Sequence, residues 1–199
     1  MAYKPILFNT EMVQAIMAGR KTQTRRLVKN QDGIHPRRNN IGWLGWDDGH
    51  GYRMKPPCEA GDILWVRETW HKDAGRYMYK ANYAGGERFY RNGQEVSIRW
   101  SPSIHMPKEA ARIFLRVKDV RVERLQDIKN YECVDEGAVK KPNITKRGDL
   151  VLHNRYKEEF ARLWDTTIKP ADLGKYGWDA NPWVWVIEFE RCEKPEGWC

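Results

Sequence analysis

The residue types that could do chemistry lie together in the stretch Gly19–Arg26, which reads Gly-Arg-Lys-Thr-Gln-Thr-Arg-Arg. Lys21 is its only lysine, and three arginines crowd it, so like-charge repulsion should lower the pKa of its ammonium group. A lysine with a lowered pKa can act as a general base or nucleophile near neutral pH. The hydroxyl of Thr24 is a weak nucleophile that needs such a base. Lys21 and Thr24 are therefore candidates for a catalytic pair.

The same stretch has a second interpretation, as a surface that binds phosphate. Between residues 18 and 38 there are seven basic residues and one acid, so most of the net charge of +8 is concentrated there. Basic clusters are typical of nucleic-acid-binding proteins, and a solvated basic face gives the same pattern. The candidates for contact with a substrate or a nucleic acid in this stretch are Arg20, Thr22, Arg25 and Arg26.

The path of the chain sets a condition on the catalytic interpretation. In a regular strand Lys21 and Thr24 would point to opposite faces, because side chains alternate along a strand. The two residues can act together only if the segment turns. Gly19 favours a turn, since it follows a helical pattern and can adopt a positive φ at a helix C-terminus.

Glu136 is the third catalytic candidate. With Asp135 it ends a helix predicted over Asp127–Glu136 and stopped by Gly137, where the negative end of the helix dipole disfavours acidic side chains. A residue that breaks a local rule can mark a functional site, with a positively charged partner as compensation. The alternative is a frayed helix end whose two carboxylates are solvated.

Composition limits the class of protein. With 199 residues, 41% of them hydrophobic, the chain is expected to form one domain over residues 1–199 with a real core. No apolar run approaches the ~20 residues of a membrane span, and no signal peptide is recognisable, so a cytoplasmic protein without membrane contact is expected. The five histidines and four cysteines lack metal-ligand spacing, and no phosphate-binding glycine motif occurs. We therefore expect no metal and no cofactor; the oligomeric state is left open.

The hydrophobic pattern indicates the elements that would position these residues. Strands are expected at 6–8, 63–70, 77–83 and 183–190, with helices after Asn9 and over 154–164. Between 113 and 122 the alternation shifts phase by one residue, which predicts a bulge or a sharp bend. Strands outnumber helices, so we expect an α+β, β-rich fold: a small curled sheet or partial barrel with helices packed beside it. Segments at about 30–60 and 84–110 are expected to be long loop insertions.

Ten tryptophans are many for this length, and their spacing indicates which of them belong to the core. Those at strand or helix spacing are expected in the core: Trp65, Trp164, Trp183 and Trp185. Trp43, Trp46 and Trp70 are instead candidates for platforms on which bases stack. His105 lies in a loop bracketed by prolines, where it could line a pocket; a structural loop histidine is the alternative.

These motifs resemble those of ASCH domains, members of the PUA-like superfamily. Gly19-x-Lys21 followed by Arg26 is similar to the G-x-K-x-x-x-x-R signature of ASCH domains, and Gly61-Asp62 before a strand also matches. The longer segments Trp65–Trp70 and Ser103–Pro107 resemble a phage- and prophage-encoded branch of the superfamily. The resemblance covers residues 5–26, 60–83, 100–137 and 155–190.

The resemblance implies a PUA-like pseudobarrel whose cleft binds RNA or a nucleobase. One small ASCH family with a similar Ala-Gly-Arg-Lys-Thr stretch hydrolyses the amide of N4-acetylcytidine through a lysine, a threonine and a glutamate. These roles fall on Lys21, Thr24 and Glu136: the threonine attacks the acyl carbon, the lysine takes its proton, and the glutamate orients the lysine or a water.

Three functions stay open at this point. The first is amide hydrolysis on a modified pyrimidine nucleoside or nucleobase, with the residues just named. The second is metal-independent RNA cleavage, in which Lys21 and Arg26 stabilise the charge of the phosphorane. The third is a non-catalytic module that binds RNA or modified DNA. A polymer-binding protein should lose affinity steeply as salt rises, whereas a nucleoside hydrolase should not, because its substrate is uncharged.

Overall fold

The computed structural model describes residues 1–29, 31, 54–83, 85, 87–138 and 156–198. For four strands outside these ranges, at 35–39, 42–47, 143–144 and 150–151, it describes the path of the backbone. Trp43 and Trp46 therefore have side chains outside the described residues.

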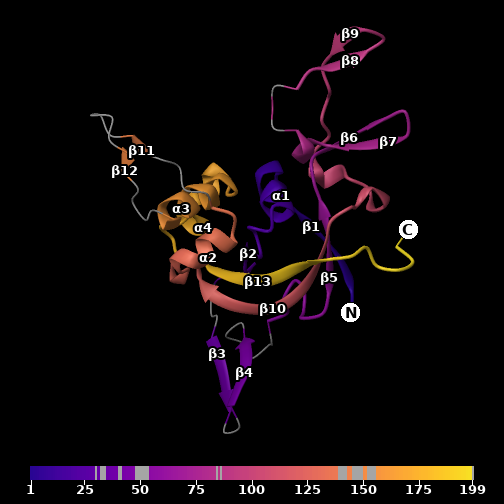
Figure 1. Cartoon of the computed structure of the whole chain (residues 1–199). Coiled ribbons are helices and arrows are strands. Elements are labelled where there is room, and N and C mark those ends of the chain that lie inside the picture. Colours follow the sequence, from indigo (N-terminus) through magenta and orange to yellow (C-terminus); the bar gives the residue numbers. More distant parts are fainter. Residues whose placement is uncertain are drawn as a thin grey trace.

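A five-stranded mixed sheet forms the centre of the fold (Figure 1). Its strands, in spatial order, are β1 (Tyr3–Leu7), β5 (Ile63–Arg67), β10 (Phe114–Arg124), β13 (Trp183–Cys192) and β2 (Gln23–Leu27). The pair β1–β5 is parallel and the other neighbours are antiparallel. Figure 1 shows the long strands β10 and β13 curving together. Among the strands that the structure describes, no ladder joins β1 to β2, so the sheet is curled and open.

Helices pack beside this sheet. The helix α1 (Thr10–Met17) lies between β1 and β2 in the chain and begins at Asn9, whose side chain accepts a hydrogen bond from the N–H of Met12 at 2.8 Å. The other helices follow β10: α2 (Asn130–Asp135), α3 (Tyr156–Thr166) and α4 (Leu173–Tyr176). Short 3₁₀ turns connect the elements at Lys80–Asn82, Ser103–His105, Lys108–Ala110, Leu125–Asp127 and Pro170–Asp172. Within the described part of the chain, no helix has the length and apolar character needed to cross a membrane.

The alternation of β13 lets it contribute to two hydrophobic clusters, one on each face of the sheet. Trp185, Ile187 and Phe189 pack with α1 and β5 in the first cluster. Val184 and Val186 pack with α2 and α3 in the second. A third cluster, around the start of β10, holds the C-terminal Trp198. The first two clusters fix α1 and α2 on opposite faces of β13, with β2 at its edge.

The bulge predicted in the long strand is present in β10. Its register against β13 shifts between Val117 and Asp119, which leaves Lys118 as the extra residue. Because of this shift, Leu115 and Val117 before the bulge and Val122 after it all enter the first cluster. Together with the element content, this confirms the predicted fold class: α+β, β-rich, with a curled mixed sheet and flanking helices.

The segments expected to be loop insertions each contain a hairpin, which the sequence analysis did not predict. The segment at 30–60 holds β3 (His35–Asn39) paired with β4 (Gly42–Asp47), and the segment at 84–110 holds β8 (Phe89–Arg91) paired with β9 (Gln94–Val96). The turn of the second hairpin is Asn92-Gly93, with φ of 52° and 77°. An Asn-Gly pair with both residues at positive φ is a strong hairpin signal, which the polar composition of the segment masked.

The strand expected over 63–70 is also divided in two. It breaks after β5, and β6 (Trp70–Asp73) then pairs with β7 (Arg76–Tyr79) through a turn at Ala74-Gly75. A further short pair, β11 (Asn143–Ile144) and β12 (Leu150–Val151), lies between α2 and α3 in the chain.

Candidate functional site

The end of α1 places Lys21 outside the strand that carries Thr24. Gly19 has a φ of 71°, its N–H donates to the carbonyl of Ile16 at 3.0 Å, and the N–H of Arg20 donates to that of Ala15 at 2.9 Å. This pair of bonds is a Schellman motif, which ends a helix and reverses the chain. Lys21 follows this turn and precedes β2, so it lies outside the regular strand that carries Thr24.

The end of α2 is built in the same way and brings Glu136 to the same place. Gly137 has a φ of 89°, and its N–H donates to the carbonyl of Val134 at 2.8 Å. The N–H of Ala138 donates to the carbonyl of Cys133 at 2.9 Å, which completes a second Schellman motif. Glu136, the C-cap residue, is thereby held 3% exposed against the turn that carries Lys21.

The two helix ends meet through the ammonium group of Lys21. Its Nζ donates to Oε2 of Glu136 at 2.9 Å, to the backbone carbonyl of Glu136 at 2.8 Å and to the carbonyl of Gln23 at 2.8 Å. All three N–H donors are therefore used, and Lys21 is 2% exposed. A cation at the carbonyl end of α2 offsets both the helix dipole and the carboxylate there. This is the positively charged partner that the position of Glu136 predicted.

Burial lowers the pKa of Lys21, opposed by Glu136 and aided by the charges of Arg26 and Arg25. The predicted direction is confirmed, but the main cause differs from the prediction. Loss of solvent around the ammonium group outweighs the repulsion from the neighbouring arginines, because the turn after α1 carries the side chain into the interior.

Arg25 lies beneath the site and holds the other oxygen of Glu136. Its guanidinium is 3.1 Å from Oε1 of Glu136 and 3.4 Å from both Glu123 and Glu132, and the residue is 2% exposed. Its Nε atom is buried without an acceptor among the described residues. The sequence made Arg25 a candidate for contact with phosphate. In the structure its guanidinium is instead paired with three carboxylates, and it helps to position Glu136.

Thr24 lies next to this pair without being hydrogen-bonded to it. It is 1% exposed and pairs with Ile187 across the β2–β13 ladder. Lys21 contacts the carbonyl of Gln23, the residue just before Thr24. Among the described residues no hydrogen bond joins the Thr24 hydroxyl to Lys21 or Glu136. Catalytic hydrogen bonds often form only when substrate binds, so this geometry is compatible with the predicted pair.

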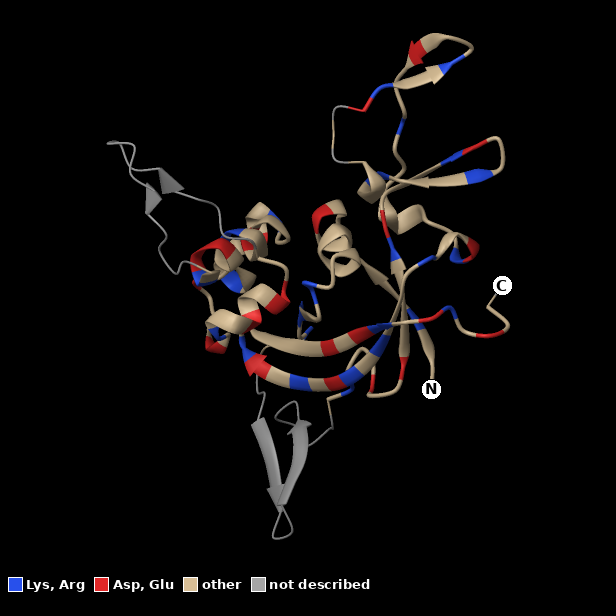
Figure 2. Cartoon of the chain, in the orientation of Figure 1, with Lys and Arg blue, Asp and Glu red and all other residues tan. Residues whose placement is uncertain are grey.

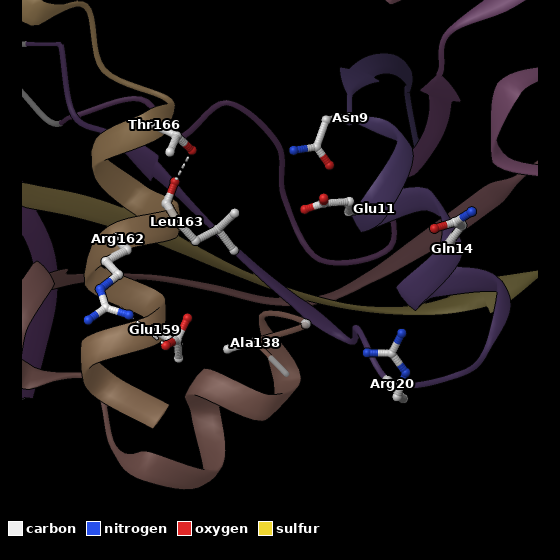
Figure 3. Close-up of a pocket in the computed structure, with 10 residues that line it drawn as sticks. Asn9, Glu11, Gln14, Arg20, Ala138, Glu159, Arg162, Leu163 and Thr166 are labelled. Atoms are coloured by element: carbon white, nitrogen blue, oxygen red, sulfur yellow. Dashed lines mark hydrogen bonds and ion pairs between the residues drawn. The ribbon is translucent and has the colours of Figure 1, made fainter. Parts of the chain in front are cut away.

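A cleft of about 490 Å³ opens beside the two helix ends. Figure 3 shows that it lies between α1 and α3, lined by Asn9, Glu11, Gln14, Arg20, Gly137, Ala138, Glu159, Arg162, Leu163 and Thr166. A Cβ atom added at Gly137 would lie 3.6 Å from the Cβ of Lys21. Lys21 therefore lies directly behind the wall of the cleft at Gly137, and the exposed Arg20 is the predicted binding residue that lines it.

The remaining candidates are distributed around the molecule. Thr22 is exposed, and its N–H donates to the carbonyl of Asp135 at 2.9 Å. Arg26 is half-buried and donates to the carbonyl of Leu7 at 2.9 Å, so it links the two open edges of the sheet. Trp70 and His105 are not brought to Lys21. Trp70 packs against Tyr77 at the third cluster, and His105 is exposed in a 3₁₀ turn.

Two charged networks in the described residues were not foreseen. Arg121 and Glu132 extend the carboxylate network around Arg25, on the face of β10 that the bulge turns away from the first cluster. Glu68 is fully buried and binds Arg112 through two hydrogen bonds of 2.8 and 2.9 Å. An acid inside an apolar segment was the available signal for Glu68. In the same part of the chain, no group of three or more residues with the geometry of metal ligands occurs, and Cys58, Cys133 and Cys192 are free thiols.

The comparisons with known proteins find likeness only at the level of three-dimensional structure. No protein-family model matches the sequence, and no curated protein matches it. A protein from Enterococcus faecalis V583, EF3133, assigned to the family model DUF984, aligns with 98% of the chain and 84% of its own at 12% identity and a TM-score of 0.45. The hypothetical protein PH0355 aligns with 96% and 100% at 14% identity and a TM-score of 0.40. An ASCH domain from Lactobacillus crispatus JV V101 aligns with 97% and 81% at 8% identity and a TM-score of 0.40.

Proposed function

We propose that this chain is an ASCH-type protein directed at nucleosides or nucleic acids, and that it hydrolyses the amide of a modified pyrimidine such as N4-acetylcytidine. Lys21, Thr24 and Glu136 form the proposed catalytic set. The observation that supports this most is the buried contact of Lys21 with Glu136, which are 115 positions apart in the sequence, at the wall of a cleft.

The proposed reaction gives each of the three groups a different role. Lys21 donates three hydrogen bonds and is therefore protonated, so it must first lose one proton to solvent, and with it one of these bonds. The Thr24 hydroxyl then attacks the acyl carbon and its proton passes to the neutral amine of Lys21. The lysine then protonates the amino group of the departing pyrimidine. A water molecule then attacks the acyl-threonine and gives a proton to Lys21, which passes it to the departing Thr24 oxygen as the carboxylic acid is released. Glu136 stabilises the protonated lysine at 2.9 Å in each half of the cycle.

The placement of charge favours this reaction over the other two functions. Lys21 and Arg25 supply part of the basic cluster in the sequence, yet both are buried against carboxylates. Arg26, which would stabilise a phosphorane in RNA cleavage, donates to the carbonyl of Leu7. The cleft itself is lined by two acids, Glu11 and Glu159, as well as by Arg20 and Arg162, and this mixed lining suits an uncharged nucleoside better than a phosphodiester backbone.

The test is chromatographic turnover of free N4-acetylcytidine without added metal. We expect the wild type to release cytidine and acetate, and Lys21→Met and Thr24→Val to lose roughly 10²- to 10⁴-fold in rate, the usual contribution of a positioned base. Lys175→Met, the same exchange at an exposed lysine of α4, is the matched control and should keep the wild-type rate. Circular dichroism of each variant separates loss of activity from loss of fold. Full activity in Lys21→Met, or no conversion by the wild type, would refute the assignment.

A further inference from the structure

Two hairpins project from the body of the molecule, and we call the segment that carries them the arm (residues 70–101; Figure 1). The arm contains β6–β7 and β8–β9 and is described except at residues 84 and 86. Its base is closed where Trp70 and Ser101 exchange backbone hydrogen bonds of 3.1 and 2.7 Å. The chain therefore leaves the central sheet after β5, forms the arm, and returns toward β10 with the two ends of the arm hydrogen-bonded to each other.

Contacts within the arm join the hairpins to the segments that connect them and to each other. The rings of Tyr83, Phe89 and Trp100 pack on one another with centroids 5.1 to 6.3 Å apart. Nδ1 of His71 is 3.1 Å from the carbonyl of Arg99, which ties β6 to the segment after β9. An ion pair between Arg91 and Asp73 also crosses from one hairpin to the other. These contacts make the arm an ordered surface with its own small aromatic core.

The outer surface of the arm is basic. The arm carries six cationic and three acidic side chains, and all six cations are exposed: Lys72, Arg76, Lys80, Arg88, Arg91 and Arg99. Figure 2 shows basic residues on both hairpins. In the basic stretch at residues 18–38, by contrast, the cations Lys21 and Arg25 are buried. The exposed positive charge that favours contact with phosphates is therefore present on the arm.

A cleft of about 620 Å³ lies between the hairpins and combines this charge with a free ring. Tyr90 lines the cleft and is 61% exposed, so its ring is not part of the aromatic packing inside the arm. Arg99 and His71 line the same cleft. An exposed ring beside cations is the combination that proteins use for single strands, because a base can stack on the ring only when its face is not covered by a duplex neighbour.

We propose that the arm is a binding site for single-stranded nucleic acid, in which Tyr90 stacks on a base and Arg99 contacts a phosphate. The site shares no lining residue with the cleft beside Lys21. It therefore goes beyond the proposed hydrolase and does not depend on it.

The test is fluorescence anisotropy of the full chain with labelled oligouridylate and oligothymidylate of about ten nucleotides, within the ~4–16-nucleotide sites of known single-strand binders. We expect Tyr90→Ala to weaken binding roughly 5- to 150-fold, as loss of one stacked base does. Arg99→Ala should reduce the slope of log affinity against log salt by about 0.7, the value for one phosphate of a single strand. Equal affinity for the two strands would show that the arm reads rings and phosphates, and tighter binding of oligouridylate would add contact with the 2′-hydroxyl.

The controls match the variants in exposure and separate the two sites. Tyr131→Ala removes a ring on α2 that is also 61% exposed and should leave affinity unchanged. Lys21→Met should also leave it unchanged, so failure of the hydrolase and failure of the arm are distinguishable. The proposal is overturned if the wild type binds neither oligonucleotide, if Tyr90→Ala and Arg99→Ala both bind as the wild type does, or if a duplex of equal length binds as tightly. The first of these outcomes would assign the exposed ring and charge to a protein partner.

Discussion

The ammonium group of Lys21 donates to three acceptors, so Lys21 must become neutral before it can accept a proton from Thr24. As long as all three bonds are made, the nitrogen is protonated and has no lone pair for the Thr24 proton. Arg25 competes for Glu136 from the other side at 3.1 Å. A substrate that drew the carboxylate toward Arg25 would lower the pKa of Lys21 further and favour loss of a proton to solvent, which leaves a neutral amine that can act as a base.

The lowered pKa of Lys21 predicts the pH dependence of the proposed reaction. A base must be neutral to work, so kcat/KM should rise with pH through the pKa of Lys21 and then level off. Because burial lowers that pKa, half of the maximal value should be reached below pH 10.5, the ordinary value for lysine. Turnover of N4-acetylcytidine across a pH series measures this. A rate that falls as pH rises would show that Lys21 acts in its protonated form instead.

At the scale of elements, the site exists because two helices end against each other. A Cβ atom at Gly137 would lie 3.2 Å from the Cβ of Ala15 in α1, a separation tighter than most side chains accept. Gly19, at the other helix end, has open space around it. Both residues have positive φ, so both resist substitution for reasons of conformation, and only Gly137 also resists for reasons of space.

We therefore predict unequal effects of the same substitution at the two helix ends. Gly19→Ala should lower the free energy of unfolding by about 1–2 kcal/mol, the cost of a left-handed conformation outside glycine. Gly137→Ala should cost that amount and about 1–3 kcal/mol more, because the added methyl group overpacks the contact with α1 and Lys21. Urea denaturation of the two variants measures the difference. Equal losses would mean that the helix ends can move apart freely.

Local patterns predicted these elements better than they predicted how the elements meet. Gly19 as a helix end, the bulge after Val117 and the two faces of β13 follow from residue types at neighbouring positions, and the structure confirms them. The contact of Lys21 with Glu136 joins two distant helix ends, and only the family resemblance related them. The burial of Arg25 depends on three carboxylates from other elements, which no local pattern reveals.

At the scale of the whole molecule, the distribution of charge separates interior from surface in a way that composition hides. The net charge of +8 is counted over residues with very different roles. Some cations, such as Lys21 and Arg25, neutralise buried carboxylates and hold the helix ends together. Those of the arm are all exposed, although Arg88 and Arg91 also form ion pairs with Glu95 and Asp73. Exposed positive charge therefore does not simply follow the most basic stretch of the sequence, in which Lys21 and Arg25 are buried.

The packing of the strands predicts which parts of the molecule open most readily. Strands β10 and β13 share a long ladder between two buried clusters, whereas β8 and β9 are three residues each and mostly exposed. Amides in well-packed central strands exchange only on global unfolding, and those in short exposed hairpins exchange by local opening. Hydrogen exchange read by mass spectrometry should thus be slowest in peptides spanning 114–124 and 183–192 and fastest in 89–96. Comparable protection in all three would contradict this order.

The extra residue Lys118 makes β10 respond differently to two kinds of genetic change. Exchange of one codon alters one side chain and leaves the alternation of the others intact. Loss or gain of one codon beyond Val117 reverses the alternation, so that Val122 leaves the core while Arg121 and Glu123 enter it. Descendants of this gene are therefore expected to vary in this strand by replacement and to keep its number of residues constant.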